Sequence, residues 1–90
     1  KLCAFVRVTT EGIGSELGKT LFRFKEVEEV HCVAGEECLL LKVRTADTSS
    51  LSDLLDEIRR VKGVRKTITS IVLSTLLSRV VLPEPESVSA

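Results

Sequence analysis

The sequence predicts a single α+β domain in which a four-stranded antiparallel sheet carries two helices on one face. Three observations predict this class. The chain has 90 residues, enough for one domain only. Four stretches are rich in β-branched and apolar residues, with the alternation typical of strands, and two others repeat apolar residues at helical spacing. Hydrophobic residues make up 43% of the chain and aromatic residues 3%, which indicates a folded domain rather than a disordered segment.

The first strand is predicted from Leu2 to Thr10 and the first helix from Ser15 to about Phe24. The strand alternates, so that its apolar residues lie on one face: Leu2, Ala4, Val6 and Val8. Ser15 is a typical helix-capping residue. The apolar side of the helix is formed by Ile13, Leu17, Leu21 and Phe24. Gly18 lies in its middle and costs the helix up to about 1 kcal/mol.

A hairpin follows, with strands from Val27 to Ala34 and from Cys38 to Thr45 joined by a turn at Gly35. The second of these strands separates into two faces. Its apolar face, which we expect under the helices, carries Leu39, Leu41 and Val43. The opposite face carries Cys38, Leu40, Lys42 and Arg44.

The second helix has the clearest pattern in the chain. Ser50-Leu51-Ser52-Asp53 fits a capping box, and Gly63 marks the end of the helix. Its apolar stripe consists of Leu51, Leu54, Leu55, Ile58 and Val61. The last strand is predicted from Val64 to about Leu77. Residues 1–82 are then expected to form the folded domain and residues 83–90 a flexible tail.

This order of elements, βαββαβ, is that of the ferredoxin-like sandwich, with both helices on one face of the sheet. The other face is left without cover. Because the last strand has apolar residues on both sides, Ile68 and Val72 on one and Ile71 and Leu73 on the other, we expect a second copy to cover that face. The sequence thus predicts at least a homodimer.

Composition and motifs exclude several functions. Thirteen basic and thirteen acidic residues give no net charge, so this domain alone has no electrostatic attraction to nucleic acid or anionic membranes. No apolar run is long enough to span a membrane. Three cysteines without a CxxC pair suit reduced thiols in the cytoplasm. His31 and Cys32 are adjacent in a strand and should point to opposite faces, and with Cys38 they lack metal-ligand spacing. We expect the cysteines to be buried. No cofactor site or catalytic constellation was found.

Two stretches carry a resemblance: "HCVAGEECLLLKVRTAD", followed by an amphipathic helix, and "KGVRKTITSIVL". The chain resembles, from about Ala4 to Leu73, the effector-binding domain of the Lrp/AsnC transcription regulators, also called the regulation of amino acid metabolism domain. The resemblance implies a module that dimerises, often assembles into tetramers of dimers, and binds an amino acid or related small molecule between dimers. It also implies that DNA is bound by a preceding helix-turn-helix domain, which these residues do not contain.

The resemblance also implies a binding site. The family's pocket is formed by the turn after the second strand and by hydroxyl groups early in the last strand, which correspond here to Gly35, Glu36, Glu37, Cys38, Thr67 and Thr69. The two threonines are two residues apart, so we expect their hydroxyls on one side of the last strand, close to the hairpin turn on a neighbouring strand. The family pattern G-x-[YF]-D has an aspartate for the ligand's ammonium group. Here Glu37 and Cys38 occupy the last two places, and a neutral thiol does not accept an ammonium group as a carboxylate does. The effector is therefore left open: an amino acid, another small molecule, or none.

Three hypotheses follow. The first is the sensory part of an Lrp/AsnC-like regulator, and a chain that begins at Lys1 is compatible with an upstream domain. The second is a stand-alone module without a DNA-binding domain, which senses a small molecule or modulates other proteins. The third is an enzyme on the same fold. The sequence argues against it, because it contains no recognisable acid–base pair, set of metal ligands or activated nucleophile. We expect a binding module and not an enzyme.

Overall fold

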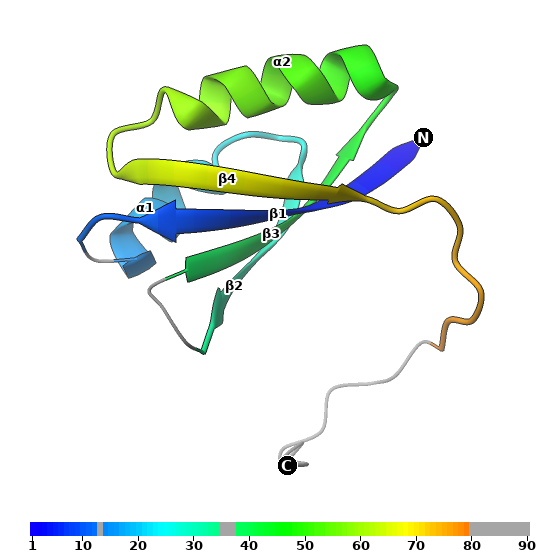
Figure 1. The fold of residues 1–90 in the computed structure, drawn as a ribbon, viewed down its shortest axis with the longest axis horizontal. Helices are drawn as coiled ribbons and strands as arrows, with labels where there is room; N and C mark the ends of the chain where they lie inside the picture. The colour runs from blue at the N-terminus through cyan, green and yellow to red at the C-terminus, as the bar shows by residue number, and fades with distance from the viewer. Residues whose placement is uncertain (13, 35–37, 80–90) are drawn as a thin grey trace.

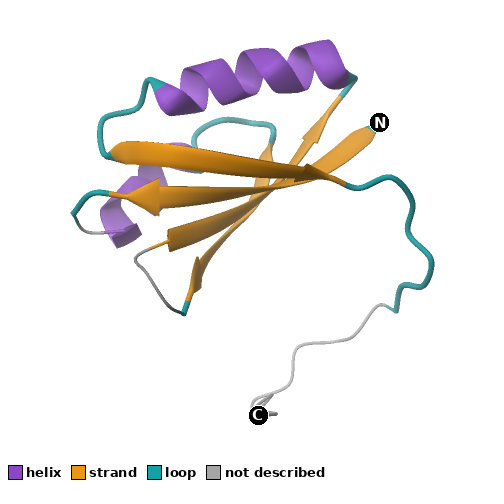
Figure 2. Ribbon diagram, in the orientation of Figure 1, coloured by secondary structure: helices purple, strands orange, loops and turns teal. Residues whose placement is uncertain are grey.

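The six predicted elements are present in the predicted order (Figures 1 and 2). The structure, a computed structural model, describes residues 1–12, 14–34 and 38–79. The elements are β1 (Leu2–Thr10), α1 (Gly14–Leu21), β2 (Val27–Val33), β3 (Cys38–Thr45), α2 (Thr48–Arg59) and β4 (Val64–Ile71). The predicted tail at residues 83–90 lies outside the described residues, as does Ile13. Within the described part of the chain, no helix is long and apolar enough to cross a membrane.

The four strands form one antiparallel sheet in the order β2-β3-β1-β4, which is the ferredoxin-like arrangement predicted from the sequence. The hairpin strands β2 and β3 pair with each other, and β1 lies between β3 and β4. Because β1 and β4 are far apart in the sequence, this pairing is what closes the domain. It leaves β2 and β4 as the two edges of the sheet.

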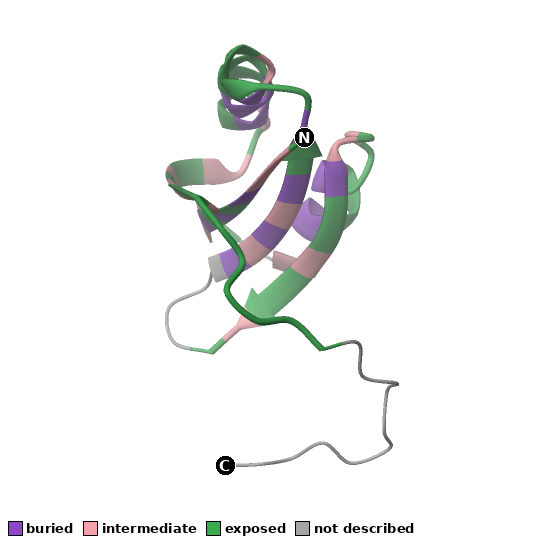
Figure 3. Cartoon of the chain, turned by 90° about the vertical axis from the view of Figure 1, so that its right-hand side faces the viewer, coloured by how far each residue is buried: buried purple, intermediate pink, exposed green. Residues whose placement is uncertain are grey.

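One face of the sheet is buried beneath both helices. The fully buried strand residues are Ala4, Val6 and Val8 in β1 and Leu41 and Val43 in β3. Helix α1 contributes Leu17 and Leu21 to this core, and α2 contributes Leu51, Leu54, Leu55 and Ile58. Buried and exposed bands alternate along the strands in Figure 3, as the period of two in the sequence requires. The predicted core faces of β1, β3 and α2 are confirmed.

Helix α1 is shorter than predicted. It begins at Gly14 rather than Ser15 and ends at Leu21 rather than at about Phe24. Beyond Leu21 the chain tightens: the N–H of Phe24 donates to the carbonyl of Leu21 and that of Val27 to the carbonyl of Phe24. These short turns bring Phe24 back against the core and allow β2 to start at Val27.

Helix α2 starts one turn earlier than the predicted capping box. Its N-cap is Asp47, whose carboxylate accepts a hydrogen bond of 2.8 Å from the backbone N–H of Ser50. The Thr45 hydroxyl donates to the Asp47 carbonyl at 3.1 Å and fixes the entry of the chain into the helix. The predicted start was wrong because Asp47, as the N-cap, already accepts a hydrogen bond from a backbone N–H of the first turn, so no capping box of Ser50 and Asp53 is needed.

The Asp47 cap gives stability a pH dependence. Hydrogen bonds from Ser50, foremost from its backbone, lower the pKa of the Asp47 carboxyl in the folded chain. Because the pKa is lower in the folded chain than in the unfolded chain, the charged carboxylate stabilises the folded state. This stabilisation is complete above the unfolded pKa of about 4 and is lost as the pH falls through the folded pKa. Asp47→Ala should therefore lower the urea midpoint more at pH 7 than at pH 2, where the protonated carboxyl keeps only a neutral capping oxygen. Asp47→Asn, which keeps a capping oxygen, should lose less at pH 7; equal losses would argue against this cap.

Strand β4 is also shorter than predicted and ends at Ile71 instead of about Leu77. Ile71 pairs with Ala4, and the N–H of Val72 donates to the carbonyl of Cys3 at 2.9 Å. Because β1 starts at Leu2, it has almost no further residues with which β4 could pair. The apolar residues after Val72 therefore leave the sheet.

Candidate functional site

The predicted threonines lie side by side on the helix-covered side of the edge strand β4. Thr67 pairs with Val8 and Thr69 with Val6, and both valines are buried beneath the helices. The Nε of Arg59, at the end of α2, donates a hydrogen bond of 3.2 Å to the Thr67 hydroxyl. Since that bond uses Thr67 only as an acceptor, its own O–H can donate to a ligand.

Thr69 opens on a small cavity between α2 and β4. The cavity measures about 230 Å³ and is lined by Thr48, Leu51, Ser52, Leu55, Arg59, Thr69 and Ile71. The polar groups of the lining are three hydroxyls and the Arg59 guanidinium, and the remaining lining residues are apolar. A ligand that presents both an anionic group and an aliphatic chain matches this lining.

The predicted turn residues are placed only in part. Gly35, Glu36 and Glu37 lie outside the described residues. Cys38 opens β3, where its backbone lies opposite Val33 of β2 and Thr9 of β1. The structure thus gives the backbone position of the strand that enters from the turn.

Thr67 and Thr69 do not lie on a strand beside the one that leaves the turn. We expected the hairpin on a strand neighbouring theirs, and this was wrong, because β1 separates β4 from β3. Cys38 is level with Lys66 across β1, so two strand spacings, roughly 10 Å, lie between them. The shared side of Thr67 and Thr69 is confirmed by their pairing with Val8 and Val6.

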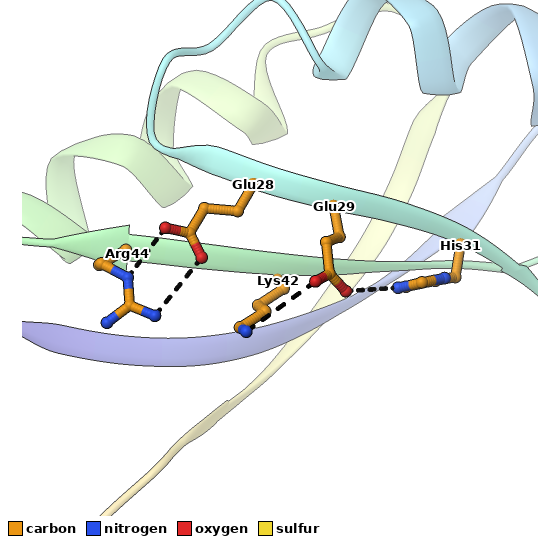
Figure 4. A network of polar contacts seen from close by, with 5 residues as sticks. All are labelled: Glu28, Glu29, His31, Lys42 and Arg44. Atoms are coloured by element: carbon orange, nitrogen blue, oxygen red, sulfur yellow. Dashed lines mark hydrogen bonds and ion pairs between the residues drawn. The ribbon is translucent and has the colours of Figure 1, made fainter. Parts of the chain in front are cut away.

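The open face of the sheet carries a network of charges that the sequence reading did not identify (Figure 4). The Nε of Arg44 lies 2.9 Å from Oε2 of Glu28, and Nζ of Lys42 lies 3.9 Å from Oε2 of Glu29. The His31 Nε2 lies 2.8 Å from Oε1 of the same Glu29. The hairpin register could have revealed the second pair, because it sets Glu29 directly opposite Lys42.

These pairs match acids of β2 with bases of β3 on the open face, whereas Arg7 of β1 lies on the same face outside them. The hydrogen bond from Arg44 lowers the pKa of the Glu28 carboxyl, and the same bond raises the pKa of the Arg44 guanidinium. Most members are exposed and Lys42 is partly exposed, so each pair adds little to stability. A partner surface could therefore approach this face without having to neutralise a single-sign charge cluster.

Apolar residues occupy the same open face beside the charges. Phe5 and Ile68 are partly exposed, and Leu40 is half-buried. Arg7 lies between Leu40 and Ile68 in the register, so apolar and basic side chains alternate across the strands. The open face is therefore mixed, as the sequence predicts for β3, where Leu40 stands beside Lys42 and Arg44, and its apolar part lies on β1, β3 and β4.

The histidine and cysteines are arranged as separate side chains. His31 faces the open side with Glu29, whereas Cys32 lines a cavity on the α1 side, which confirms that the two point to opposite faces. Among the described residues, no group of three or more His, Cys, Asp or Glu side chains could hold a metal ion. The expectation of buried cysteines was wrong for Cys32, which is exposed on the edge strand β2, and Cys3 is only half-buried.

The cavity beside Cys32 was not anticipated. It measures about 480 Å³ and lies between α1 and β2, lined mainly by apolar groups that include Phe22, Val30 and Leu39. Gly18 forms part of its wall, and a β-carbon there would lie 3.3 Å from Val30 Cγ1. The glycine therefore permits close packing of α1 on the edge strand. This packing explains why a glycine stands here although it lowers the stability of the helix.

Comparisons with known proteins agree with this geometry. The family model described as the Lrp/AsnC ligand binding domain matches residues 3–82. The HTH-type transcriptional regulator FL11 of Pyrococcus horikoshii is 34% identical over 83 residues, which cover 91% of this chain and 55% of that protein. The chain therefore spans about half the length of this curated relative.

Two solved structures share the fold. The feast or famine regulatory protein of M. tuberculosis, complexed with L-methionine, is 40% identical with a TM-score of 0.71, covering 86% of this chain and 53% of that one. The protein TTHA0845 from Thermus thermophilus is 28% identical with a TM-score of 0.79, covering 87% of this chain and all of that one. Homocitrate synthase of Saccharolobus islandicus is 40% identical over 50 residues, which is 56% of this chain but only 11% of the enzyme.

Proposed function

The chain belongs to the Lrp/AsnC ligand-binding domain family, and we propose that it is the effector-binding and oligomerisation part of a transcription regulator. This family is a regulatory ligand-binding domain and not an enzyme family. The effector we propose is an amino acid or a closely related small molecule. The observation that carries this choice is the L-methionine complex of the mycobacterial relative, which is 40% identical to this chain.

The proposed assembly is a homodimer formed by two open sheet faces. Phe5, Leu40 and Ile68 supply apolar contacts, and the acids of β2 are already paired with the bases of β3. Such a twofold interface uses the same surface of both copies, so that it closes without leaving a further open face. Dimers of this kind are the units that we propose to associate further, as a tetramer of dimers.

The proposed effector site is built from two copies. One copy supplies the turn at Gly35, Glu36, Glu37 and Cys38, and a neighbouring copy supplies Thr67 and Thr69. The separation of β3 from β4 by β1 within one chain supports this division, because roughly 10 Å lie between Cys38, at the start of β3, and Lys66 on β4. Backbone N–H groups at a glycine turn can bind the ligand carboxylate.

Binding at such a shared site links the effector to assembly. A ligand that contacts two copies has a higher affinity for the assembled state, so it shifts the population towards that state. The affinity of a preceding DNA-binding domain, if it is joined to this chain, would then change through the same equilibrium. The ligand needs no direct contact with DNA.

A calorimetric titration of the purified chain with each of the twenty amino acids tests the function. We expect saturable binding of at least one of them, with apolar side chains favoured by the leucines of the α2–β4 cavity. If none binds to the folded chain, the proposal of an amino acid effector is wrong. Cys38→Asp, which restores the family's carboxylate, should then produce binding if the thiol alone abolished it.

The threonine hydroxyls are expected to contribute directly to affinity. Thr67→Val and Thr69→Val keep the shape of the side chain but remove the donor, so each should weaken effector binding about tenfold. Thr67→Ser and Thr69→Ser are the matched controls, because they retain the hydroxyl. Unchanged affinity in both valine variants, measured by calorimetry, would exclude these positions from the site.

A second candidate is a module that acts without its own DNA-binding domain. It is favoured by the Thermus thermophilus structure, the whole of which this chain covers, and by the homocitrate synthase, which shares a segment with this chain within a much longer enzyme. In this case the module senses a small molecule or modulates another protein. The reading frame upstream of Lys1 discriminates the two, because a helix-turn-helix pattern there supports the regulator.

A further inference from the structure

Residues 72–79 form an apolar arm that leaves the domain after β4. Figure 1 shows this segment running beyond the end of the sheet. Leu73 is 94% exposed, Leu76 87% and Leu77 93%. Single exposed leucines are common on protein surfaces, but three within five residues, all nearly fully exposed, are typical of a segment that binds another surface.

The domain cannot readily cover this arm itself. The hydrogen bond from the Val72 N–H to the Cys3 carbonyl is at the end of the β1–β4 ladder, and β1 extends only to Leu2. To return over its own sheet, the arm would have to reverse direction immediately after β4. Residues 72–79 contain neither glycine nor proline, the residues that most favour such a reversal.

A matching surface exists on the open face of the same chain. Ile68 is 52% exposed and Phe5 37%, and Leu40 lies across Arg7 from Ile68. The arm suits this surface because its polar residues, Ser74, Thr75 and Ser78, are uncharged, so its approach brings no carboxylate or ammonium group against the apolar part. Its single charge within the described range is Arg79 at the far end.

We propose that residues 72–79 are an exchanged arm, which packs Leu73, Leu76 and Leu77 on the open face of a second copy. This inference rests on the proposed homodimer and specifies how the mixed open face is covered. Since each copy both donates an arm and receives one, the exchange is symmetric and closes at two copies. The occupant of the face is thus a defined segment of the same protein.

Sedimentation equilibrium of the 90-residue chain tests the exchange. The triple variant Leu73→Ser, Leu76→Ser and Leu77→Ser should raise the dimer dissociation constant by about a hundredfold or more, because six leucines per dimer lose their contacts. The matched control, Ser74→Ala, Thr75→Ala and Ser78→Ala, alters the polar positions of the same arm and should leave the constant unchanged. If the wild-type chain and the leucine variant dimerise with the same dissociation constant, the proposed arm exchange is wrong, although the dimer itself is supported.

A fluorescent reporter separates exchange from the other arrangements. The chain contains no tryptophan, so Leu76→Trp introduces a unique probe. Its emission should shift to the blue as the protein concentration rises through the dimer dissociation constant. A shift that is the same at every concentration would mean that the arm folds on its own domain, which overturns the exchange. A wild-type chain that sediments as a monomer throughout would overturn the proposed dimer itself.

Discussion

Replacing Leu41 with alanine is expected to lower the free energy of unfolding by about 3–5 kcal/mol. Leu41 is fully buried at the centre of the sheet, where β3 pairs with both β1 and β2 and the side chain lies beneath the helices. The substitution leaves a cavity that the surrounding strands cannot fill by moving, because two ladders hold the backbone. For a domain of 90 residues, this is a large part of the total stability.

Leu40→Ala is the matched control for this prediction. Leu40 is the adjacent residue, of the same type and on the same strand, but it faces the open side and is only half-buried. We expect a loss below about 1 kcal/mol in the monomer. Its effect should increase with protein concentration, because the open face is the proposed dimer interface. Equal losses in urea denaturation of dilute samples would mean that the two faces of β3 are not distinguished as described.

Replacing Ile68 with lysine is expected to dissociate the proposed dimer. Ile68 lies on the open face of β4, and a twofold interface would bury the new ammonium group twice beside the like charge of Arg7, which lies opposite Ile68 on β1. Two buried unpaired charges cost at least about 3 kcal/mol, which raises the dissociation constant more than a hundredfold. Because Ile68 is partly exposed in the single chain, the fold itself should persist, as circular dichroism would verify.

Ser49→Lys provides the same change of charge at an exposed position of α2, on the other side of the sheet from the proposed interface. It should leave the sedimentation of the dimer unchanged. A dimer that tolerates Ile68→Lys with an unaltered dissociation constant must use another surface. In that case the exchanged arm would also lose its proposed receiving face.

The faces of the strands and of α2 could be predicted from the sequence because they depend on local periodicity. Alternation in Leu39, Leu41 and Val43 gave the buried face of β3, and the stripe from Leu51 to Ile58 gave that of α2. A one-residue shift would move all these side chains into solvent, so few alternatives compete with the observed register. The order of the elements, with its short connections, then restricted the fold to one familiar arrangement.

The ends of elements depended on contacts that the local pattern does not contain. Asp47 competed successfully with the Ser50 cap, and this was decided by the path of the chain from Thr45. The end of β4 depended on where β1 begins, at the opposite end of the sequence. Exposure of Cys32 resulted from the position of β2 at the sheet edge, which the strand order determines.

The candidate site was accessible to sequence reasoning only through the family resemblance. Nothing in the spacing of Thr67 and Thr69 distinguishes ligand donors from ordinary strand threonines, since threonine favours strands in general. The structure adds their common side, the hydrogen bond from Arg59 and the adjoining cavity. In the proposed site the turn comes from one copy and the threonines from another, and such a relation is not encoded in any local pattern.

The central claim, that an effector binds between copies and thereby controls their assembly, is tested most directly by sedimentation velocity during a ligand titration. The chain is held at one concentration, and the amino acid that binds most tightly by calorimetry is added to saturation. Effector-linked assembly predicts a saturable change in the sedimentation coefficient with the same midpoint as binding. An unchanged distribution of species at saturating ligand would contradict the claim.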